Sequence, residues 1–162
     1  MIQRTDFRLA VFVVIRDDAG RVLLQRRAGT EFMNGYYDFP SGHVDTGESF
    51  TEAAIRELAE ETGLIVDESD LEVLHLNQNY LDLPYINVVF NAKKWSGTPQ
   101  ILESDKCDDQ QFFALDALPE KCTLAVRYVE QAGWTGGPHL SKITPEDFQK
   151  LIGVPHTDVY SY

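Results

Sequence analysis

The sequence predicts an α/β fold in which a mixed β-sheet is sandwiched between α-helices. Apolar runs of strand length recur along the chain, and segments with helix start and stop signals lie between them. With 162 residues, of which 43% are hydrophobic, the chain is long enough to bury a core without disulfides or metal ions. We therefore predict a single domain that spans residues 1–162.

The first two strands are predicted to form a hairpin. Arg8–Ile15 is expected to be a buried strand, Asp17–Gly20 a tight turn, and Arg21–Gln25 the partner strand. Later stretches of strand character predict three further strands: Leu71–Leu76, Tyr85–Lys93 and Gln110–Leu115.

The first helix is predicted over Phe50–Thr62. Ser49 is expected to cap this helix through its hydroxyl, and Glu52, three residues later, to reach back and complete a capping box. Gly63 then supplies the residue that ends the helix.

Two further helices are predicted toward the C-terminus. One covers Leu124–Ala132, and another opens at Thr144 with Pro145 at its first helical position. Between them, the glycine-rich stretch Gly133–Lys142 is expected to be a loop.

The charge balance argues against two classes of partner. The 14 Lys and Arg residues face 26 Asp and Glu residues, so the formal net charge is -12. Such a protein repels phosphate backbones and anionic lipid surfaces unless a cation intervenes, which makes long nucleic acid and membranes unexpected partners. The N-terminal apolar run Leu9–Ile15 is too short for a signal peptide or a membrane span.

The cysteine usage favours a reducing compartment. Cys107 and Cys122 have no metal-ligand spacing and form no disulfide framework, so both are interpreted as small apolar residues. A cytoplasmic location is therefore expected.

The helix Phe50–Thr62 carries an unusual cluster of acids. At about 100° per residue, Glu57 and Glu61 share one face and Glu60 flanks them, beside an apolar stripe. Like charges one turn apart destabilise a helix by roughly 0.2–0.5 kcal/mol per pair. A hard divalent cation such as Mg²⁺ would offset this repulsion, because it prefers carboxylate oxygens. The alternative for the helix alone is a solvated charged face without a ligand.

The stretch that contains these acids, Gly42–Leu64, resembles the signature of the Nudix hydrolases, G-x5-E-x7-R-E-U-x-E-E-x-G-U, in which U is a bulky aliphatic residue. We call this stretch the box, and its glutamates Glu57, Glu60 and Glu61 the box acids. The flanking sequences YYDFPSGH and CDDQQFFALDALP are also similar to segments of that family, although Ser41 stands where many relatives have glycine. Every fixed position of the signature is met: Gly42, Glu48, Arg56, Glu57, Leu58, Glu60, Glu61, Gly63 and Leu64.

The resemblance implies a mixed sheet between helices and Mg²⁺-dependent hydrolysis, with Mn²⁺ as a possible substitute, of a nucleoside diphosphate linked to another group. It implies four metal ligands, namely the carboxylates of Glu57, Glu60 and Glu61 and the backbone carbonyl of Ser41.

Arg56 would orient these acids, most simply by pairing with Glu48, which the loop folds back toward the helix. From spacing alone, Arg56 could equally pair with Glu52 on the surface.

The general base in this family is a box glutamate or an acid from a later loop. Glu103 and Asp109 are the candidates, and Asp105 and Asp108 lie in the same segment, ESDKCDD. A solvated acidic loop is the alternative interpretation of that segment.

Arg26 and Arg27 could bind substrate phosphates through their guanidinium groups. Because adjacent strand residues face opposite ways, at most one of them is expected to do so. An ordinary surface role is the alternative for both.

His43 is interpreted as a loop residue. Several aromatic residues offer stacking faces for a base or belong to the core: Tyr36, Tyr37, Phe39, Tyr80 and Tyr85.

The leading hypothesis is a pyrophosphohydrolase acting on a small nucleotide, either a nucleoside triphosphate or another nucleoside diphosphate derivative. Tyr80 lies near where dinucleoside polyphosphate hydrolases of the family often have a tyrosine, which makes these hydrolases one alternative. ADP-ribose hydrolases are another. A binding module with an inactive box would lack acids, and none is missing. The related isomerases are disfavoured because Cys107 and Cys122 lie far downstream of the box. A homodimer is left open.

Overall fold

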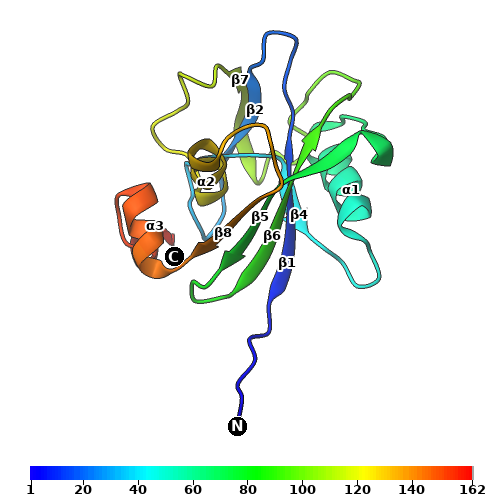
Figure 1. Ribbon diagram of the computed structural model, residues 1–162. Coiled ribbons are helices and arrows are strands. Elements are labelled where there is room, and N and C mark those ends of the chain that lie inside the picture. Colours follow the sequence, from blue (N-terminus) through cyan, green and yellow to red (C-terminus); the bar gives the residue numbers. More distant parts are fainter. Residues whose placement is uncertain (162) are drawn as a thin grey trace.

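The computed structural model describes residues 1–161, which form two β-sheets with helices on both sides (Figure 1). One sheet has five strands in the order β4-β1-β6-β5-β8, and the other has three in the order β3-β2-β7. The helix α1 lies on one side of the sheets, and α2 and α3 lie on the other. The predicted mixed α/β architecture is confirmed, with the sheet divided into two.

The strands and helices have the following bounds: β1 Arg8–Val14, β2 Val22–Arg27, β3 Tyr37–Asp38, β4 Ser41–His43, α1 Phe50–Thr62, β5 Leu71–Asn79, β6 Tyr85–Ala92, β7 Cys107–Phe113, α2 Leu124–Ala132, β8 His139–Ile143 and α3 Pro145–Ile152. Two short 3₁₀ helices are η1 Glu68–Asp70 and η2 His156–Val159.

The five-stranded sheet is mixed. Strand β1 pairs antiparallel with β4 and parallel with β6, so that Arg8 lies opposite Tyr85 and Val14 opposite Asn91. Strand β5 pairs antiparallel with β6 and parallel with β8. The parallel pairings join parts of the chain that are far apart in sequence.

The predicted hairpin of β1 and β2 is wrong beyond its turn. The Gly20 N–H donates to the Asp17 carbonyl at 2.9 Å, and a single bridge joins Arg16 and Val22, but the two strands then enter different sheets. Strand β1 is apolar at successive positions because both of its faces are buried. This makes it a central strand with distant partners.

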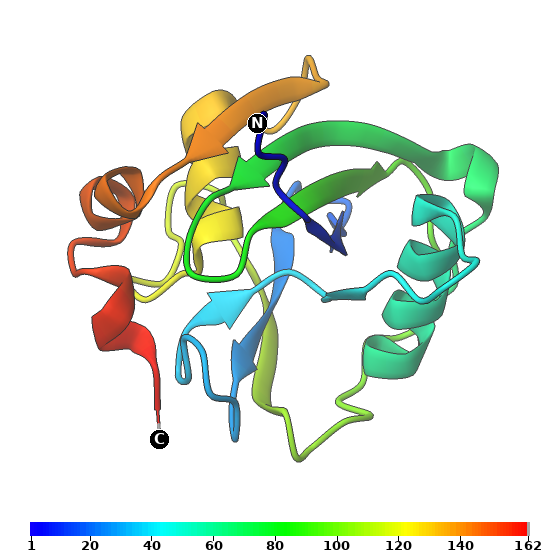
Figure 2. The ribbon, with the colours of Figure 1, turned by 90° about the horizontal axis from the view of Figure 1, so that it is seen from below.

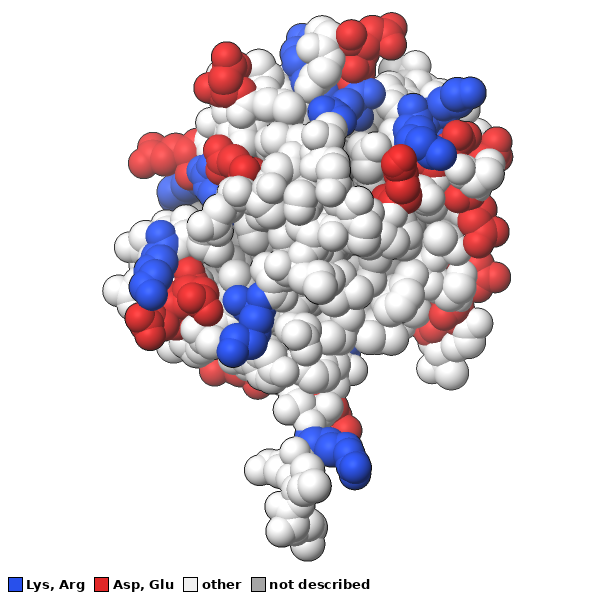
Figure 3. Space-filling model, in the orientation of Figure 1, with Lys and Arg blue, Asp and Glu red and all other residues white. Residues whose placement is uncertain are grey.

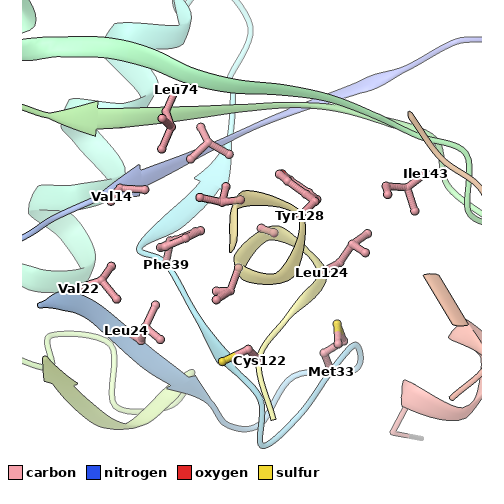
Figure 4. Packing of buried hydrophobic residues seen from close by; sticks show 14 of the residues in the cluster. Val14, Val22, Leu24, Met33, Phe39, Leu74, Cys122, Leu124, Tyr128 and Ile143 are labelled. Carbon is pink, nitrogen blue, oxygen red and sulfur yellow. The ribbon is translucent and has the colours of Figure 1, made fainter. Parts of the chain in front are cut away.

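Two hydrophobic clusters fill the space on either side of β1. Val11 and Val13 pack toward α1, where Ala54 and Leu58 are also buried. Val14 belongs to the second cluster, which joins both sheets to α2 and is drawn in Figure 4 with Leu24, Phe39 and Tyr128 among its members.

The helix predictions are confirmed at both ends of α1. Ser49 and Glu52 form the capping box, and Gly63 adopts the left-handed conformation, φ 75°, while its N–H donates to the Ala59 carbonyl. Helices α2 and α3 also begin where the sequence predicts, α3 after a Thr144–Asp147 capping box.

The strand predictions are less accurate. Strand β5 runs on to Asn79, β7 begins earlier at Cys107, and His43, predicted in a loop, ends strand β4. Strand β8 occupies part of the predicted loop Gly133–Lys142. In its sequence, HLSKI, the polar residues His139 and Ser141 pair with the polar residues His75 and Asn77 of β5. The strand therefore lacks the apolar pattern by which a sequence reveals a strand.

The surface charge is uneven. On the face in Figure 3, charged side chains lie around the edge, acidic ones on both the α1 side and the opposite side, and the centre is largely uncharged. None of the helices within residues 1–161 combines the length and apolar character that crossing a membrane requires.

Candidate active site

The signature stretch forms β4, a loop and α1, which together bring its acids beside a cavity. Gly42 lies in β4 directly against the carboxylate of Glu57. A Cβ atom at position 42 would overlap that carboxylate, so only glycine permits this approach.

Arg56 is the centre of an ion-pair network. Its guanidinium binds Glu48 through two hydrogen bonds, Nε to Oε2 at 2.7 Å and Nη2 to Oε1 at 2.8 Å. Its Nη1 atom donates to Glu57 at 2.8 Å and to Glu60 at 3.3 Å. Glu52 instead accepts the Ser49 N–H at the start of α1. The pairing is therefore with Glu48 rather than on the surface.

The network shifts the pKa of Glu48. The guanidinium of Arg56 and the N–H of Asp45 both donate to its carboxylate, and they lower the pKa of Glu48 to about 2. Glu48 is therefore charged throughout the range in which the protein is expected to work, and it fixes the orientation of Arg56.

The three box carboxylates have different environments. Glu61 is the most enclosed, and it accepts the Ser41 N–H at 3.0 Å and a Gln25 amide hydrogen at 2.9 Å. Burial raises the pKa of Glu61 to about 8, although these two hydrogen bonds oppose the shift. The Glu57 side chain is 15% exposed and that of Glu60 is 50% exposed. Burial also raises the pKa of Glu57, against the influence of Arg56.

These residues are suitable ligands for a hard cation. Within residues 1–161 no group of three or more His, Cys, Asp or Glu side chains is gathered closely enough to hold a metal ion, and Arg56 engages both Glu57 and Glu60. Even so, the acids offer only oxygen donors, and mutual repulsion helps to raise the pKa values of Glu57 and Glu61. A bound cation would relieve that repulsion, which is the chemistry of a Mg²⁺ or Mn²⁺ site.

The two candidate general bases, Glu103 and Asp109, have different positions relative to the box. The Leu102 N–H donates to the Glu61 backbone carbonyl at 3.2 Å, which holds Glu103 beside the C-terminal part of α1. The charge of Glu103 acts on both Glu57 and Glu61, and Glu103 lines the cavity described below.

Asp109 points away from the box. The neighbouring Gln110 donates to Gln25, which itself contacts Glu61, and alternation along β7 turns Asp109 to the opposite face of the three-stranded sheet. There its carboxylate accepts hydrogen bonds from the Tyr37 hydroxyl and from Gln111.

A cavity of about 600 Å³ lies beside the box. Gly42, Glu57 and Glu61 line it on the side of α1. On the side of the C-terminal residues, which Figure 2 shows across the molecule from α1, Phe32 and Tyr160 line it. Its volume is in the range of about 300–1,000 Å³ that is typical of small-molecule sites.

Arg26 and Arg27 both line the cavity, but their guanidinium groups have different partners. Arg26 pairs with Asp108 at 2.6 Å and lies over the Tyr37 ring. Arg27 donates to the Phe32 carbonyl at 3.0 Å and lies 3.7 Å from the buried Asp38 carboxylate. Arg27 is thus the one directed toward the interior.

The aromatic candidates are divided between the core, the surface and the cavity. Phe39 is buried in the core, and Tyr80 packs against Phe7 outside the cavity lining. Tyr85 lines the cavity, and its hydroxyl shares a hydrogen bond of 2.9 Å with His43.

Sequence reasoning missed several cavity residues. Gln25, Tyr128 and Tyr160 were not singled out. Gln25 had a signal, since it is a buried amide that directly follows the three apolar residues with which β2 begins. The two tyrosines had none, because nothing local distinguishes them from core or tail residues.

Comparisons with known proteins identify relatives of this chain. The family model described as NUDIX domain matches residues 6–131. An RNA pyrophosphohydrolase of Teredinibacter turnerae is 38% identical over 81 residues, which cover 50% of this chain and 44% of the relative. The NAD-capped RNA hydrolase NudC of Pseudomonas aeruginosa is 35% identical over 109 residues, which cover 67% of this chain and 36% of the relative. The matches thus span less than half the length of these two relatives.

Solved structures show the same likeness. A MutT NUDIX hydrolase from Burkholderia pseudomallei superposes with a TM-score of 0.72 and 29% identity, covering 78% of this chain and 98% of that chain. The family model covers well over half of the 162 residues and includes the whole signature stretch. The protein belongs to the NUDIX domain family.

Proposed function

We propose that the protein is a Mg²⁺-dependent pyrophosphohydrolase that cleaves a phosphoanhydride bond in a nucleoside triphosphate or another nucleoside diphosphate derivative. One observation carries this proposal: the carboxylates of Glu57 and Glu61 line a cavity of small-molecule size, and Glu103 lines it with them. A family relationship and this acid set together favour phosphoryl chemistry over simple binding.

Glu57, Glu60 and Glu61, with the backbone carbonyl of Ser41, would hold Mg²⁺, and Mn²⁺ could replace it. When bound, the metal would neutralise charge on the phosphate oxygens and lower the pKa of a water molecule.

The surrounding groups keep these acids in place. Arg56 restrains Glu57 and Glu60, and Glu48 in turn fixes the guanidinium. The Gln25 amide and the Ser41 N–H orient the Glu61 carboxylate. Such hydrogen bonds limit the freedom of each ligand before substrate arrives.

Glu103 is the proposed general base. Its electrostatic effect on Glu57 and Glu61 and its position in the cavity wall support this role, in which it accepts a proton from the attacking water. Arg27 is the proposed phosphate contact, because it already turns toward a buried carboxylate in the cavity wall.

The bond cleaved follows from the chemistry of the ligand. The net charge of -12 disfavours binding of a free phosphomonoester dianion, whereas two neighbouring phosphoryl groups can chelate a carboxylate-bound cation. We expect a nucleoside triphosphate to give nucleoside monophosphate and pyrophosphate, and a sugar-linked nucleoside diphosphate to give two monophosphates.

A panel of nucleotides with Mg²⁺, separated by chromatography, tests this proposal. Nucleoside diphosphate plus orthophosphate from triphosphates, or rapid cleavage of phosphomonoesters, would overturn the assigned bond while leaving the metal site possible. No turnover with any phosphoanhydride would leave a binding module with an inactive box.

The phosphorylated end of an RNA is a second candidate substrate. The names of the relatives, RNA pyrophosphohydrolase and NAD-capped RNA hydrolase, motivate this candidate, and the charge of -12 disfavours contacts along an RNA backbone. Equal specificity constants for a 5′-triphosphate dinucleotide and a long 5′-triphosphate RNA would mean that only the end is bound. A single domain and a cytoplasmic location stay predictions.

A further inference from the structure

The part of the chain beyond the family match contributes one residue, Tyr160, to the cavity lining. The NUDIX model ends at residue 131, and β8, α3 and η2 follow it. We call residues 155–161 the C-terminal segment. Figure 2 shows it on the opposite side of the molecule from α1. It therefore cannot contribute to the carboxylate side, but it can contribute to the other side.

Backbone contacts attach the C-terminal segment to the loop between β2 and β3. The Met33 N–H donates to the Val159 carbonyl at 2.8 Å, and the Ser161 N–H donates to the Glu31 carbonyl at 2.6 Å. Between them, Phe32 and Tyr160 form an antiparallel bridge. Main-chain pairing thus fixes the position of both aromatic residues.

The two rings form one wall of the cavity. The centroids of Phe32 and Tyr160 are 5.2 Å apart, and both residues line the cavity. The ring of Phe148, in α3, packs against Phe32 with 6.3 Å between the two ring centroids. Leu81 and Leu83, from the loop between β5 and β6, line the same cavity. An apolar, aromatic wall of this kind suits a flat ring.

A buried polar group in the cavity wall also points to a ligand. Tyr128 of α2 lines the cavity and is 2% exposed, and within residues 1–161 its hydroxyl has no hydrogen-bond partner. Buried polar atoms without partners are rare, and each one calls for an explanation. A polar atom on a ring bound in the cavity would supply the missing partner.

We propose that the C-terminal segment completes the substrate site, with Phe32 and Tyr160 as a stacking wall for the nucleobase and the Tyr128 hydroxyl as its hydrogen-bond partner. The inference rests on the proposed function only in taking the ligand to be a nucleotide. The cation held by the box acids would bind the phosphate end, and these three residues bind the base. The preference for one nucleotide over another is then set on this side of the cavity.

Binding of reaction products tests the inference apart from catalysis. We would titrate the protein with four nucleoside monophosphates and with ribose 5-phosphate, in Mg²⁺, and follow NMR chemical shifts. At least one nucleoside monophosphate is expected to bind about tenfold more tightly than the base-free ribose 5-phosphate, because stacking of a base on an aromatic side chain contributes at this level.

Tyr160→Leu should weaken binding of that nucleotide about tenfold and leave ribose 5-phosphate unchanged. Tyr160→Phe keeps the ring and should bind as the unaltered protein does. Tyr80→Leu is the matched control, because Tyr80 packs against Phe7 and does not line the cavity. Should Tyr160→Leu fail to fold in a melting experiment, Tyr128→Phe replaces it, since it removes only a hydroxyl that makes no bond in the fold.

The outcomes separate the two proposals. Equal affinity for all five ligands, no binding at all, or full affinity in Tyr160→Leu would overturn the base site. Phosphoanhydride hydrolysis with an unaffected Tyr160→Leu variant would overturn the base site alone. Tyr160-dependent nucleotide binding without any hydrolysis would overturn the proposed function alone.

Discussion

The two sides of the cavity are built from different interactions. On the carboxylate side, Arg56 and the Gln25 amide hold charged groups that one loop and one helix supply. On the aromatic side, backbone bridges and ring contacts join Phe32 to Tyr160, more than a hundred residues later in the chain. A substitution that removes a charge on the carboxylate side should therefore lower the rate of the reaction. A substitution that removes a ring or a hydroxyl on the aromatic side should lower the affinity for substrate.

The largest expected effect is on the carboxylate side. Glu60→Gln and Glu61→Gln each remove a charged oxygen while keeping shape and helix propensity, so turnover should fall on the order of a hundredfold or more with the fold intact. Steady-state kinetics with the best nucleotide and a circular dichroism spectrum measure both. Normal hydrolysis by both variants would contradict the metal site.

Metal binding should stabilise the protein through the same acids. A cation that binds only the folded state at a hundred times its Kd contributes about 2.7 kcal/mol, which raises the melting temperature by several degrees. The increase should be smaller in Glu57→Gln, because this substitution removes one of the charged oxygen ligands proposed for the cation. Melting curves with and without millimolar Mg²⁺ or Mn²⁺ provide the measurement, and identical shifts in both proteins would argue against a role of Glu57.

A smaller effect is expected on the aromatic side. Tyr128→Phe should raise KM about two- to tenfold, the value of one hydrogen bond, and leave kcat unchanged. It should not lower the melting temperature, because the hydroxyl has no partner within residues 1–161. A lower melting temperature, or a fall in kcat without a change in KM, would assign Tyr128 a different role.

The smallest effect concerns acid stability. The pKa of Glu48 is lowered to about 2 by Arg56, so its contribution to stability is present above its ordinary value of 4.5 and is lost as the pH falls through 2. Glu48→Gln should therefore be less stable than the unaltered protein at pH 7, and the difference should disappear toward pH 2. Urea unfolding at several pH values measures it, and a difference that is constant with pH would contradict the assignment.

Local signals in the sequence predicted the helices and the acid cluster. The capping box at Ser49, the stop at Gly63 and the spacing of the box acids all act within a few residues of each other, so their structural meaning is local. Arg56 was the exception, because spacing allowed two partners and only the folded loop brings Glu48 to it.

The sheet pairing and the aromatic side could not be predicted in this way. Strand β1 pairs with β4 and β6 instead of β2, the next strand in the sequence. Strand β8 overlaps a glycine-rich stretch that predicts a loop. Tyr160 enters the cavity wall only through its bridge to Phe32. Such contacts depend on tertiary structure, which a short window of sequence does not contain.

The parallel pairing of β1 with β6 also affects how the protein is made. Strand β1 leaves the ribosome before its partner Tyr85–Ala92, which follows on the order of ten seconds later at about 5–20 residues per second. During that interval the apolar residues Val11–Ile15 have no completed sheet to cover them. Pairing across such a separation is slow, so the nascent chain is exposed to aggregation and to chaperones until β6 has been synthesised.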